Sequence, residues 1–242
     1  MSINESLWIG VSGLMAHGDA MSIVGDNIAN ASTVGFKRER ANFEDVLGGE
    51  LTSQRMGGGV FLGGAQTMFE QGGLQQTGNP LDLAIEGQGF FEVQTPNGPR
   101  FTRDGAFHRA GNGQLVADAG EPVLSIGGQP IAVPPGLVSV GADGTISVAG
   151  GAVATIGVFT FPAGTELTPE GANRYIAPKD VKPVISRDAT VHQGAIESAN
   201  EDVIQGSLDL VVMQRQAEMM MRALTLFHTE FNKFATEDLP KV

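Results

Sequence analysis

The chain has 242 residues, which is enough for one ordinary domain or two small ones with a hydrophobic core. Its 15 basic and 27 acidic side chains give a net charge of −12, so nucleic acid and anionic membrane surfaces are poor partners. The lack of cysteine excludes disulfides, thiolate metal sites and cysteine nucleophiles. No apolar run reaches the ~18 residues of a membrane-spanning helix, and residues 1–36 lack the basic segment of a cleavable signal peptide.

The first 36 residues predict a helix. Apolar side chains recur there in alternating steps of four and three residues, and Gly18 and Gly25 occupy the two missing positions. Such a heptad register is typical of a helix that packs against another helix. Each glycine weakens an isolated helix by roughly 0.8–1 kcal/mol relative to alanine, but it lets a neighbouring backbone come close. The apolar members of this predicted assembly seam are Leu7, Val11, Leu14, Met21 and Ile28.

A longer register runs along the C-terminal end of the chain, where Gly206 fills one position of the heptad pattern. The ordinary interpretation is an amphipathic helix packed on its own domain, whereas a strict seam of about four heptads favours a partner helix. The apolar members of this part of the assembly seam are Val203, Leu210, Met213, Ala217, Met220, Leu224, Phe227, Phe231 and Phe234. The polar residues opposite them are Asp209, Gln216, Glu218, Arg222 and Lys233.

The middle of the chain predicts short antiparallel strands. Of the 34 glycines, 24 lie between residues 48 and 151, and 11 of the 12 prolines lie between residues 80 and 183. Glycine and proline interrupt helices and mark turns, so helices are expected only at the two ends. Apolar runs at 138–140 and 145–148 flank an Asp-Gly turn, and runs at 90–93 and 101 flank Pro-Asn-Gly-Pro, which is typical of β-hairpins.

The sequence therefore predicts an α+β chain. Its N- and C-terminal helices are expected to pair as a coiled-coil stem that carries an inserted all-β head, either barrel-like or sandwich-like. The expected parts are the N-terminal stem helix and signature at 1–36, an extended Gly-rich connector at 37–79, a β-rich head at 80–188, and the C-terminal stem helix at 189–242.

No residue pattern indicates an enzyme. The four histidines lack the spacing of metal ligands, and no nucleophile elbow is present. The glycine-rich stretch at 57–64 lacks the Lys-Ser/Thr pair of a phosphate-binding loop. Asp82, Glu86 and Asp104 are candidate paired carboxylates, but their spacing does not predict a site. We therefore expect no catalytic residue, no metal and no cofactor, with an enzyme kept only as a residual alternative.

Three segments in a fixed order resemble hallmarks of the bacterial flagellar rod and hook proteins. They are Asn27–Lys37, Gln71–Phe91 and Phe101–Phe107, and both end helices resemble those of the family in position and character. The approach to the C-terminal helix, Glu197–Val203, departs from the Asn-Val-Asn run usual there, which leaves the start of that helix open. The residues that carry the first two hallmarks are Asn27, Asn30, Thr33, Gly35, Phe36, Lys37, Asn79, Leu81, Asp82, Gly87, Gly89, Phe90 and Phe91.

The resemblance implies a structural subunit of the flagellar basal-body rod that polymerises into the axial shaft and transmits torque. Residues 130–134 and 142–147 resemble the proximal rod type, and the short segment between Lys37 and Gln71 argues against the longer insertion usual in distal rod proteins. A distal rod or hook subunit is the alternative. The implied partners are copies of the chain, other rod subunits and the flagellar type III export apparatus. The implied location is the rod where it crosses the periplasm. A surface-exposed oligomeric binding protein is an alternative from another functional class.

Overall fold

The computed structural model describes residues 3–46 and 59–237, which form two compact units. Unit 1 contains the described residues of Met1–Ala29, Glu39–Met68 and Asp202–Val242. Unit 2 contains Asn30–Arg38 and Phe69–Glu201. The chain therefore passes from one unit to the other at four places, which are 29/30, 38/39, 68/69 and 201/202.

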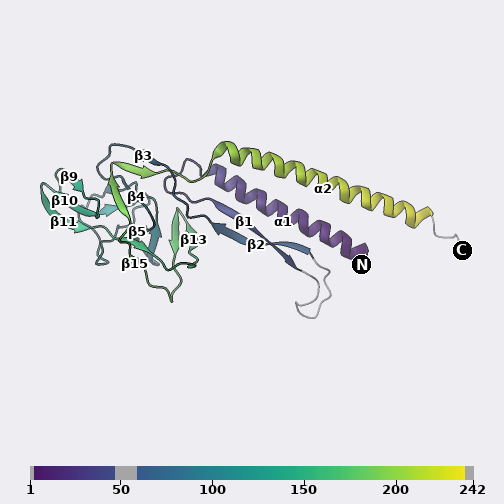
Figure 1. Cartoon of the computed structure of the whole chain (residues 1–242), viewed down its shortest axis with the longest axis horizontal. Coiled ribbons are helices and arrows are strands. Elements are labelled where there is room, and N and C mark those ends of the chain that lie inside the picture. The colour runs from purple at the N-terminus through teal and green to yellow at the C-terminus, as the bar shows by residue number, and fades with distance from the viewer. Residues whose placement is uncertain (1–2, 47–58, 238–242) are drawn as a thin grey trace. The chain divides into compact units, whose positions relative to one another are not determined.

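Unit 1 consists of two helices and one β-hairpin. The helices are α1 (Ile3–Ala29) and α2 (Val203–Glu237), and β1 (Glu39–Val46) pairs antiparallel with β2 (Gly59–Thr67). One side of α1 lies along α2 and another side lies along the hairpin (Figure 1). The Asp202 carboxylate accepts hydrogen bonds from the backbone N–H groups of Ile204 (2.9 Å) and Gln205 (3.3 Å), so it caps α2 and fixes where that helix begins. Within the described residues, neither helix is both long enough and apolar enough to cross a membrane.

Unit 2 is built from short antiparallel strands. Its largest sheet has the order β13-β14-β6-β5-β12-β15, a second sheet has the order β11-β10-β9, and three further pairs are β16-β4, β17-β3 and β7-β8. The strand bounds are β3 (Leu74–Gln76), β4 (Leu83–Glu86), β5 (Phe90–Thr95), β6 (Gly98–Thr102), β7 (His108–Arg109), β8 (Leu115–Val116), β9 (Val138–Val140), β10 (Thr145–Val148), β11 (Gly151–Thr155), β12 (Val158–Thr160), β13 (Thr168–Gly171), β14 (Arg174–Ile176), β15 (Val184–Ile185), β16 (Thr190–Gln193) and β17 (Ala195–Glu197).

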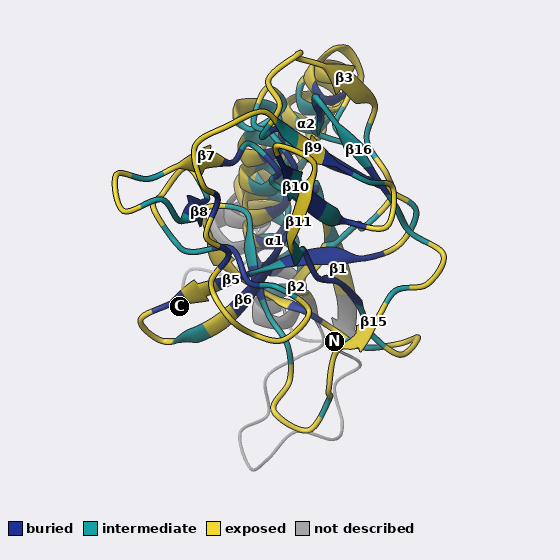
Figure 2. Ribbon diagram, turned by 90° about the vertical axis from the view of Figure 1, so that its left-hand side faces the viewer, coloured by how far each residue is buried: buried dark blue, intermediate teal, exposed yellow. Residues whose placement is uncertain are grey.

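The core of unit 2 lies on both faces of β5. Side chains alternate across a strand, so Phe91 and Val93 face one cluster while Phe90 faces another. The first cluster is the larger one and contains aliphatic residues from β4, β8 and β10. The second is mainly aromatic, with the rings of Phe90 and Tyr175 6.0 Å apart. Figure 2 shows that the buried residues are concentrated in strands and the segments between them.

The α+β class is confirmed, with a helix at each end and a β-rich middle. Both predicted hairpins are also present, because β5 pairs with β6 around Pro96-Asn97 and β9 pairs with β10 around Asp143-Gly144. Gly144 has a positive φ of 80°, which is the conformation that favours glycine in such a turn. Unit 2 extends past both ends of the predicted 80–188 head, because β3 pairs with β17 and β4 pairs with β16.

The β1–β2 hairpin was not among the predicted elements. Residues 37–79 were expected to form only an extended connector, because glycine is frequent there and lowers strand propensity. In the structure β1 and β2 pair antiparallel, with a register shift between Asn42, which pairs with Gly64, and Phe43, which pairs with Leu62. The hairpin packs on α1, and this contact is a tertiary effect that a local pattern does not contain.

Candidate functional site

The first hallmark begins at the end of α1, where Asn27 sets the start of β1. Its side-chain amide donates to the Glu39 carbonyl (2.7 Å) and its side-chain oxygen accepts from the Glu39 N–H (2.8 Å). These two bonds copy the pattern between paired residues of an antiparallel sheet. Only an amide side chain offers a donor and an acceptor in this arrangement. Asn27 is buried, so it joins the end of α1 to the beginning of the hairpin within unit 1.

Residues 30–36 form a tight turn in unit 2. Asn30 accepts hydrogen bonds at its carbonyl from the Thr33 N–H (2.9 Å) and at its side-chain oxygen from the Thr33 hydroxyl (3.3 Å). Gly35 follows with a positive φ of 67°, and a Cβ at that position would lie 2.5 Å from the Arg103 carbonyl carbon. Gly35 is therefore required both by its backbone conformation and by the close approach of a neighbouring backbone. Phe36, the next residue, is half-buried.

A buried charge cluster lies next to this turn. The Lys37 ammonium donates to the Glu197 carboxylate (2.6 Å) and to the Glu70 backbone carbonyl (2.7 Å). Arg103 donates to the other oxygen of the same carboxylate (3.0 Å). The side chains of Lys37 and Glu197 have no exposed surface, and that of Arg103 is 4% exposed. We call these three residues, Lys37, Arg103 and Glu197, the charge clasp.

The charge clasp holds two cations against one carboxylate. Burial lowers the pKa of Lys37 below its ordinary value, although the neighbouring Glu197 acts in the opposite direction. Burial also lowers the pKa of Arg103, again against the effect of Glu197. The Arg103 guanidinium lies 5.5 Å from the centre of the Phe90 ring, whose electron-rich face attracts this second cation.

The second hallmark also converges on the charge clasp. The Gly72 N–H donates to the Glu197 carboxylate (2.8 Å), and the Gly87 carbonyl accepts from Arg103 (2.6 Å). A Cβ at Gly72 would overlap the Ser198 carbonyl oxygen, so this backbone passes directly beside the segment that leads to α2. Gln71 donates to the Ile85 carbonyl (3.2 Å) and thereby joins the same segment to β4.

The remaining residues of the second hallmark have structural roles in unit 2. Asp82 accepts hydrogen bonds from the Asn79 side chain (2.7 Å) and from the Thr77 hydroxyl (2.6 Å), which fixes the turn before β4. Leu81 packs against the larger core cluster. Gly89 has a positive φ of 150°, and a Cβ there would lie 2.5 Å from a methyl group of Val158. Phe90 and Phe91 then enter the two core clusters, so this hallmark builds the core around β5.

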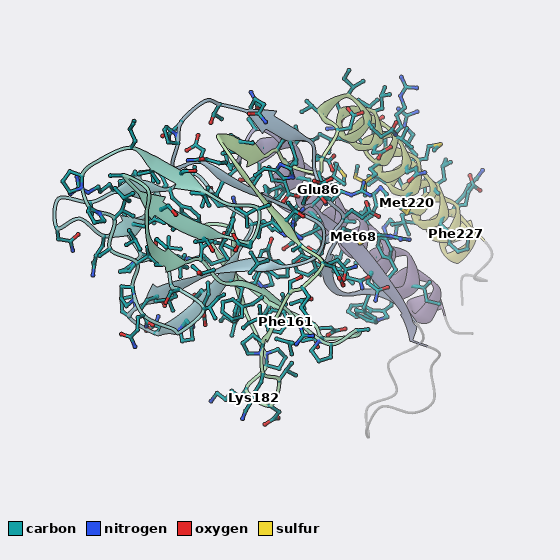
Figure 3. All side chains as sticks on the ribbon, turned by 60° about the vertical axis from the view of Figure 1, so that its left-hand side comes forward. Met68, Glu86, Phe161, Lys182, Met220 and Phe227 are labelled. Atoms are coloured by element: carbon teal, nitrogen blue, oxygen red, sulfur yellow. The ribbon has the colours of Figure 1, made fainter. Side chains whose placement is uncertain are left out.

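The predicted C-terminal seam coincides with the least exposed side of α2. From Val203 to Glu230, the residues of α2 that are not exposed are Gly206, Leu210, Met213, Ala217, Met220 and Leu224. Two seam residues differ from this pattern, since Val203 is 48% exposed and Phe227 is 65% exposed. Figure 3 labels Met220 and Phe227 on this helix. Phe231 and Phe234 lie outside the residues whose side chains the structure describes.

The covered side of α2 meets α1. A Cβ at Gly10 would overlap the Leu224 side chain, and the His17 ring contacts the Met213 carbonyl oxygen at 2.7 Å. The seam residues Val11, Leu14, Met21 and Ile28 are half-buried, and Leu7 lies outside the residues whose side chains the structure describes. The most buried positions of α1 are instead Ser12, Ala16 and Ala20, which the sequence analysis missed because small side chains carry little apolar signal.

A second apolar surface on α2 is exposed within unit 1. At about 100° per residue its members fall on the side of the helix away from the seam. They are Ile204 (75% exposed), Leu208 (57%), Val212 (52%), Met219 (61%) and Leu226 (66%). We call these five residues the outer stripe. Large apolar side chains that recur on one exposed face mark a surface for association.

Comparison with known proteins identifies the family. Residues 7–37 match the family described as flagella basal body rod protein, and residues 84–148 match the flagellar hook protein FlgE/F/G D1 domain. The flagellar basal-body rod protein FlgF of Mesorhizobium japonicum is 35% identical over 222 residues, covering 89% of this chain and 90% of the relative. FlgF of Caulobacter vibrioides is 34% identical over 249 residues, covering 99% and 100%. The rod protein FlgG of Buchnera aphidicola subsp. Schizaphis graminum is 31% identical over 248 residues, covering 90% and 94%.

The chain belongs to the flagellar basal-body rod protein family. This family consists of structural parts of the flagellum, which confirms the prediction of a structural protein and not an enzyme. The match at 7–37 spans α1 and the turn that ends at Lys37, and the match at 84–148 contains Arg103. Both matched regions therefore contribute a side chain to the charge clasp.

The described residues contain no cluster of three or more histidine, aspartate or glutamate side chains that could hold a metal ion. A groove of about 520 Å³ in unit 2 is lined by residues that include Ser125, Gln129 and Thr155, and its lining contains no titratable side chain. The candidate carboxylates Asp82 and Glu86 are engaged in a turn and in a contact with His192 (2.6 Å).

Sequence analysis missed two of the three clasp residues. Lys37 is one of the residues that carry the first hallmark, whereas Arg103 lies within the third hallmark and Glu197 begins the stretch that departs from the family pattern. The signal that could have found Glu197 is an acidic residue that directly follows the two apolar residues Ala195 and Ile196. A carboxylate in such a context is buried only when cations accompany it.

Proposed function

We propose that the chain is a subunit of the proximal flagellar rod and polymerises through its end helices into the axial shaft that transmits torque. In this proposal α1 and α2 form a coiled-coil stem, and the β-rich middle, from about 80 to 188, is a barrel-like or sandwich-like head. The partners are further copies of the chain and other rod subunits. Delivery is by the flagellar type III export apparatus, and the location is the rod where it crosses the periplasm.

The outer stripe is the observation that carries the proposal. The seam of α2 lies against α1, while the outer stripe on the other side of α2 is left uncovered within unit 1. Burying its five side chains at about 1.5–3 kcal/mol each would contribute roughly 7–15 kcal/mol. Association of two proteins costs about 4–15 kcal/mol in lost freedom and ordering. The two ranges overlap, so burying the outer stripe against one neighbour does not by itself ensure firm binding, whereas a polymer supplies each subunit with several neighbours.

The proximal assignment rests on residues 130–134 and 142–147, which resemble the proximal rod type, and on the short segment between Lys37 and Gln71. Distal rod proteins usually have a longer insertion after the first hallmark, and hook proteins usually have a larger outer region. Locating the protein in isolated basal bodies, relative to the outer rings, distinguishes these positions. A location at the distal end of the rod or in the hook would replace the proximal assignment by its alternative.

Deletion of the coding region tests the function. We expect the deletion strain to lack hooks and filaments in electron micrographs while it retains the export apparatus, because later axial components would have no shaft on which to assemble. Complementation with the intact chain should restore the filaments. Normal filaments in the deletion strain would contradict the proposal. A stable, discrete oligomer of the purified chain that never forms longer assemblies would favour the surface-binding alternative.

A further inference from the structure

The charge clasp lies among the segments at which the chain enters or leaves unit 2. Lys37 is one residue before the passage at 38/39, the Glu70 carbonyl that it binds is close to the passage at 68/69, and Glu197 precedes the passage at 201/202. Asn200 adds two further bonds, since its side chain accepts from the Arg38 N–H (2.7 Å) and donates to the Glu70 carbonyl (3.1 Å). One hydrogen-bonded network inside unit 2 therefore joins the three segments, 30–38, 69–73 and 197–201, that connect it along the chain to unit 1.

We propose that Glu197 is a positioning residue that holds these three segments, 30–38, 69–73 and 197–201, in one fixed arrangement. The carboxylate alone accepts from Lys37, Arg103 and the Gly72 N–H, and the Glu197 backbone carbonyl accepts from the Gly35 N–H (2.8 Å). Force applied to the end helices passes along the chain into unit 2 through these segments, because they are the covalent connections. The consequence for torque rests on the proposed rod function, whereas the positioning role itself does not.

The charges of the clasp distinguish a positioning role from simple core packing. If Glu197 becomes neutral, two buried cations lose their counter-ion, and a buried charge without a partner is strongly destabilising. If Lys37 becomes apolar, Arg103 and Glu197 remain as a balanced pair. The two single substitutions should therefore have unequal effects. Removing Lys37 should also relieve part of the damage done by neutralising Glu197, which a packing role does not predict.

Hydrogen exchange of the purified full-length chain, followed by mass spectrometry, measures the effect locally. We expect Glu197→Gln to speed exchange in peptides covering 30–38, 69–73 and 197–201 by about a hundredfold, with β5 and β6 unchanged. Lys37→Met should speed it by about tenfold or less, and the double variant should exchange more slowly than Glu197→Gln alone. Glu170→Gln is the matched control, because it breaks an ion pair with Arg100 (2.5 Å) in the same unit but away from the clasp.

Each outcome of the exchange experiment either supports or overturns the positioning role of Glu197. Faster exchange confined to the three segments, with partial rescue in the double variant, supports the proposal. If Glu197→Gln fails to fold but the double variant folds, the rescue is again shown. Uniformly faster exchange across unit 2, unchanged exchange in the segments, the same response to Glu170→Gln, or a double variant no better than Glu197→Gln would overturn it.

Swimming of complemented deletion strains tests the consequence for the rod. Strains carrying Glu197→Gln should assemble filaments but lose more speed than the Glu170→Gln strain as the viscosity of the medium rises, and the double variant should recover part of that loss. Equal loss in all strains would overturn the link to torque. Because hydrogen exchange needs no flagellum, its failure refutes the positioning role alone, whereas normal filaments in the deletion strain refute the rod function alone.

Discussion

Four glycines near the charge clasp allow steric overlap and backbone conformation to be separated by alanine substitution. Gly35 has a positive φ of 67° and a neighbouring backbone 2.5 Å from its would-be Cβ. Gly78 has a similar φ of 76° but no heavy atom within 4 Å of a Cβ. Gly72 has no such φ but a Cβ would overlap the Ser198 carbonyl oxygen, and Gly73 has neither feature. The four positions therefore cover every combination of the two features, a positive φ and a steric overlap at the Cβ position.

The expected losses in free energy of unfolding follow from these two features. An L-residue in the left-handed region costs about 1–2 kcal/mol, partly offset by the lower entropy of the unfolded chain, so Gly78→Ala should cost about 1 kcal/mol. Overlap with backbone atoms, which move little, costs about 1–3 kcal/mol, the expected range for Gly72→Ala. Gly35→Ala combines both and should cost about 2–5 kcal/mol. Gly73→Ala should stay within about ±0.5 kcal/mol.

Urea denaturation of the full-length chain measures these values. The single tyrosine, Tyr175, is buried in unit 2, and the single tryptophan, Trp8, is in α1, so near-UV circular dichroism follows the two units separately. With a slope of about 2 kcal/mol per M, Gly35→Ala should lower the urea midpoint of unit 2 by about 1–2.5 M. The reasoning is refuted if Gly35→Ala costs no more than Gly78→Ala, or if Gly72→Ala is as harmless as Gly73→Ala.

Three further predictions concern charge, helix capping and the seam. Burial raises the pKa of Asp104, so stability is lost as the pH rises through the folded-state pKa of this carboxyl. Asp104→Asn keeps the acceptor for the Ala106 N–H and should raise the free energy of unfolding at neutral pH. In urea titrations at several pH values, the free energy of unfolding of this variant should also depend less on pH. Asp202→Ala removes the cap of α2 and should lower the free energy of unfolding of that helix by about 1 kcal/mol, measured by far-UV circular dichroism. An unchanged free energy of unfolding would show that the capping hydrogen bonds do not stabilise the helix. Leu210→Asp and Leu208→Asp should both block rod assembly in cells, but only Leu210→Asp should destabilise the purified chain; normal motility in both would contradict the assembly proposal. Exposed Glu218→Ala is their control and should change stability by less than about 0.5 kcal/mol.

The two helices and the strand-rich middle could be predicted because they rest on local patterns. The heptad spacing from Gly206 to Leu224 appears in the structure as the covered side of α2, and proline keeps helices out of the middle. The Asp143-Gly144 and Pro96-Asn97 turns were equally readable, because turn chemistry depends on a few neighbouring residues. The family could be recognised for the same reason, since each hallmark is contiguous.

The β1–β2 hairpin and the charge clasp could be found only in the folded structure. Glycine hides the strand pattern of residues 59–67, and the hairpin gains its stability by packing on α1. Lys37 and Glu197 are 160 positions apart, and nothing in either local sequence indicates that they meet. The spacing of apolar residues determines which segments become helices and strands, because it places the apolar side chains on the one face of the element that is buried. Partners of buried charges are decided by topology, because an ion pair acts only between groups that the whole fold brings within a few ångströms.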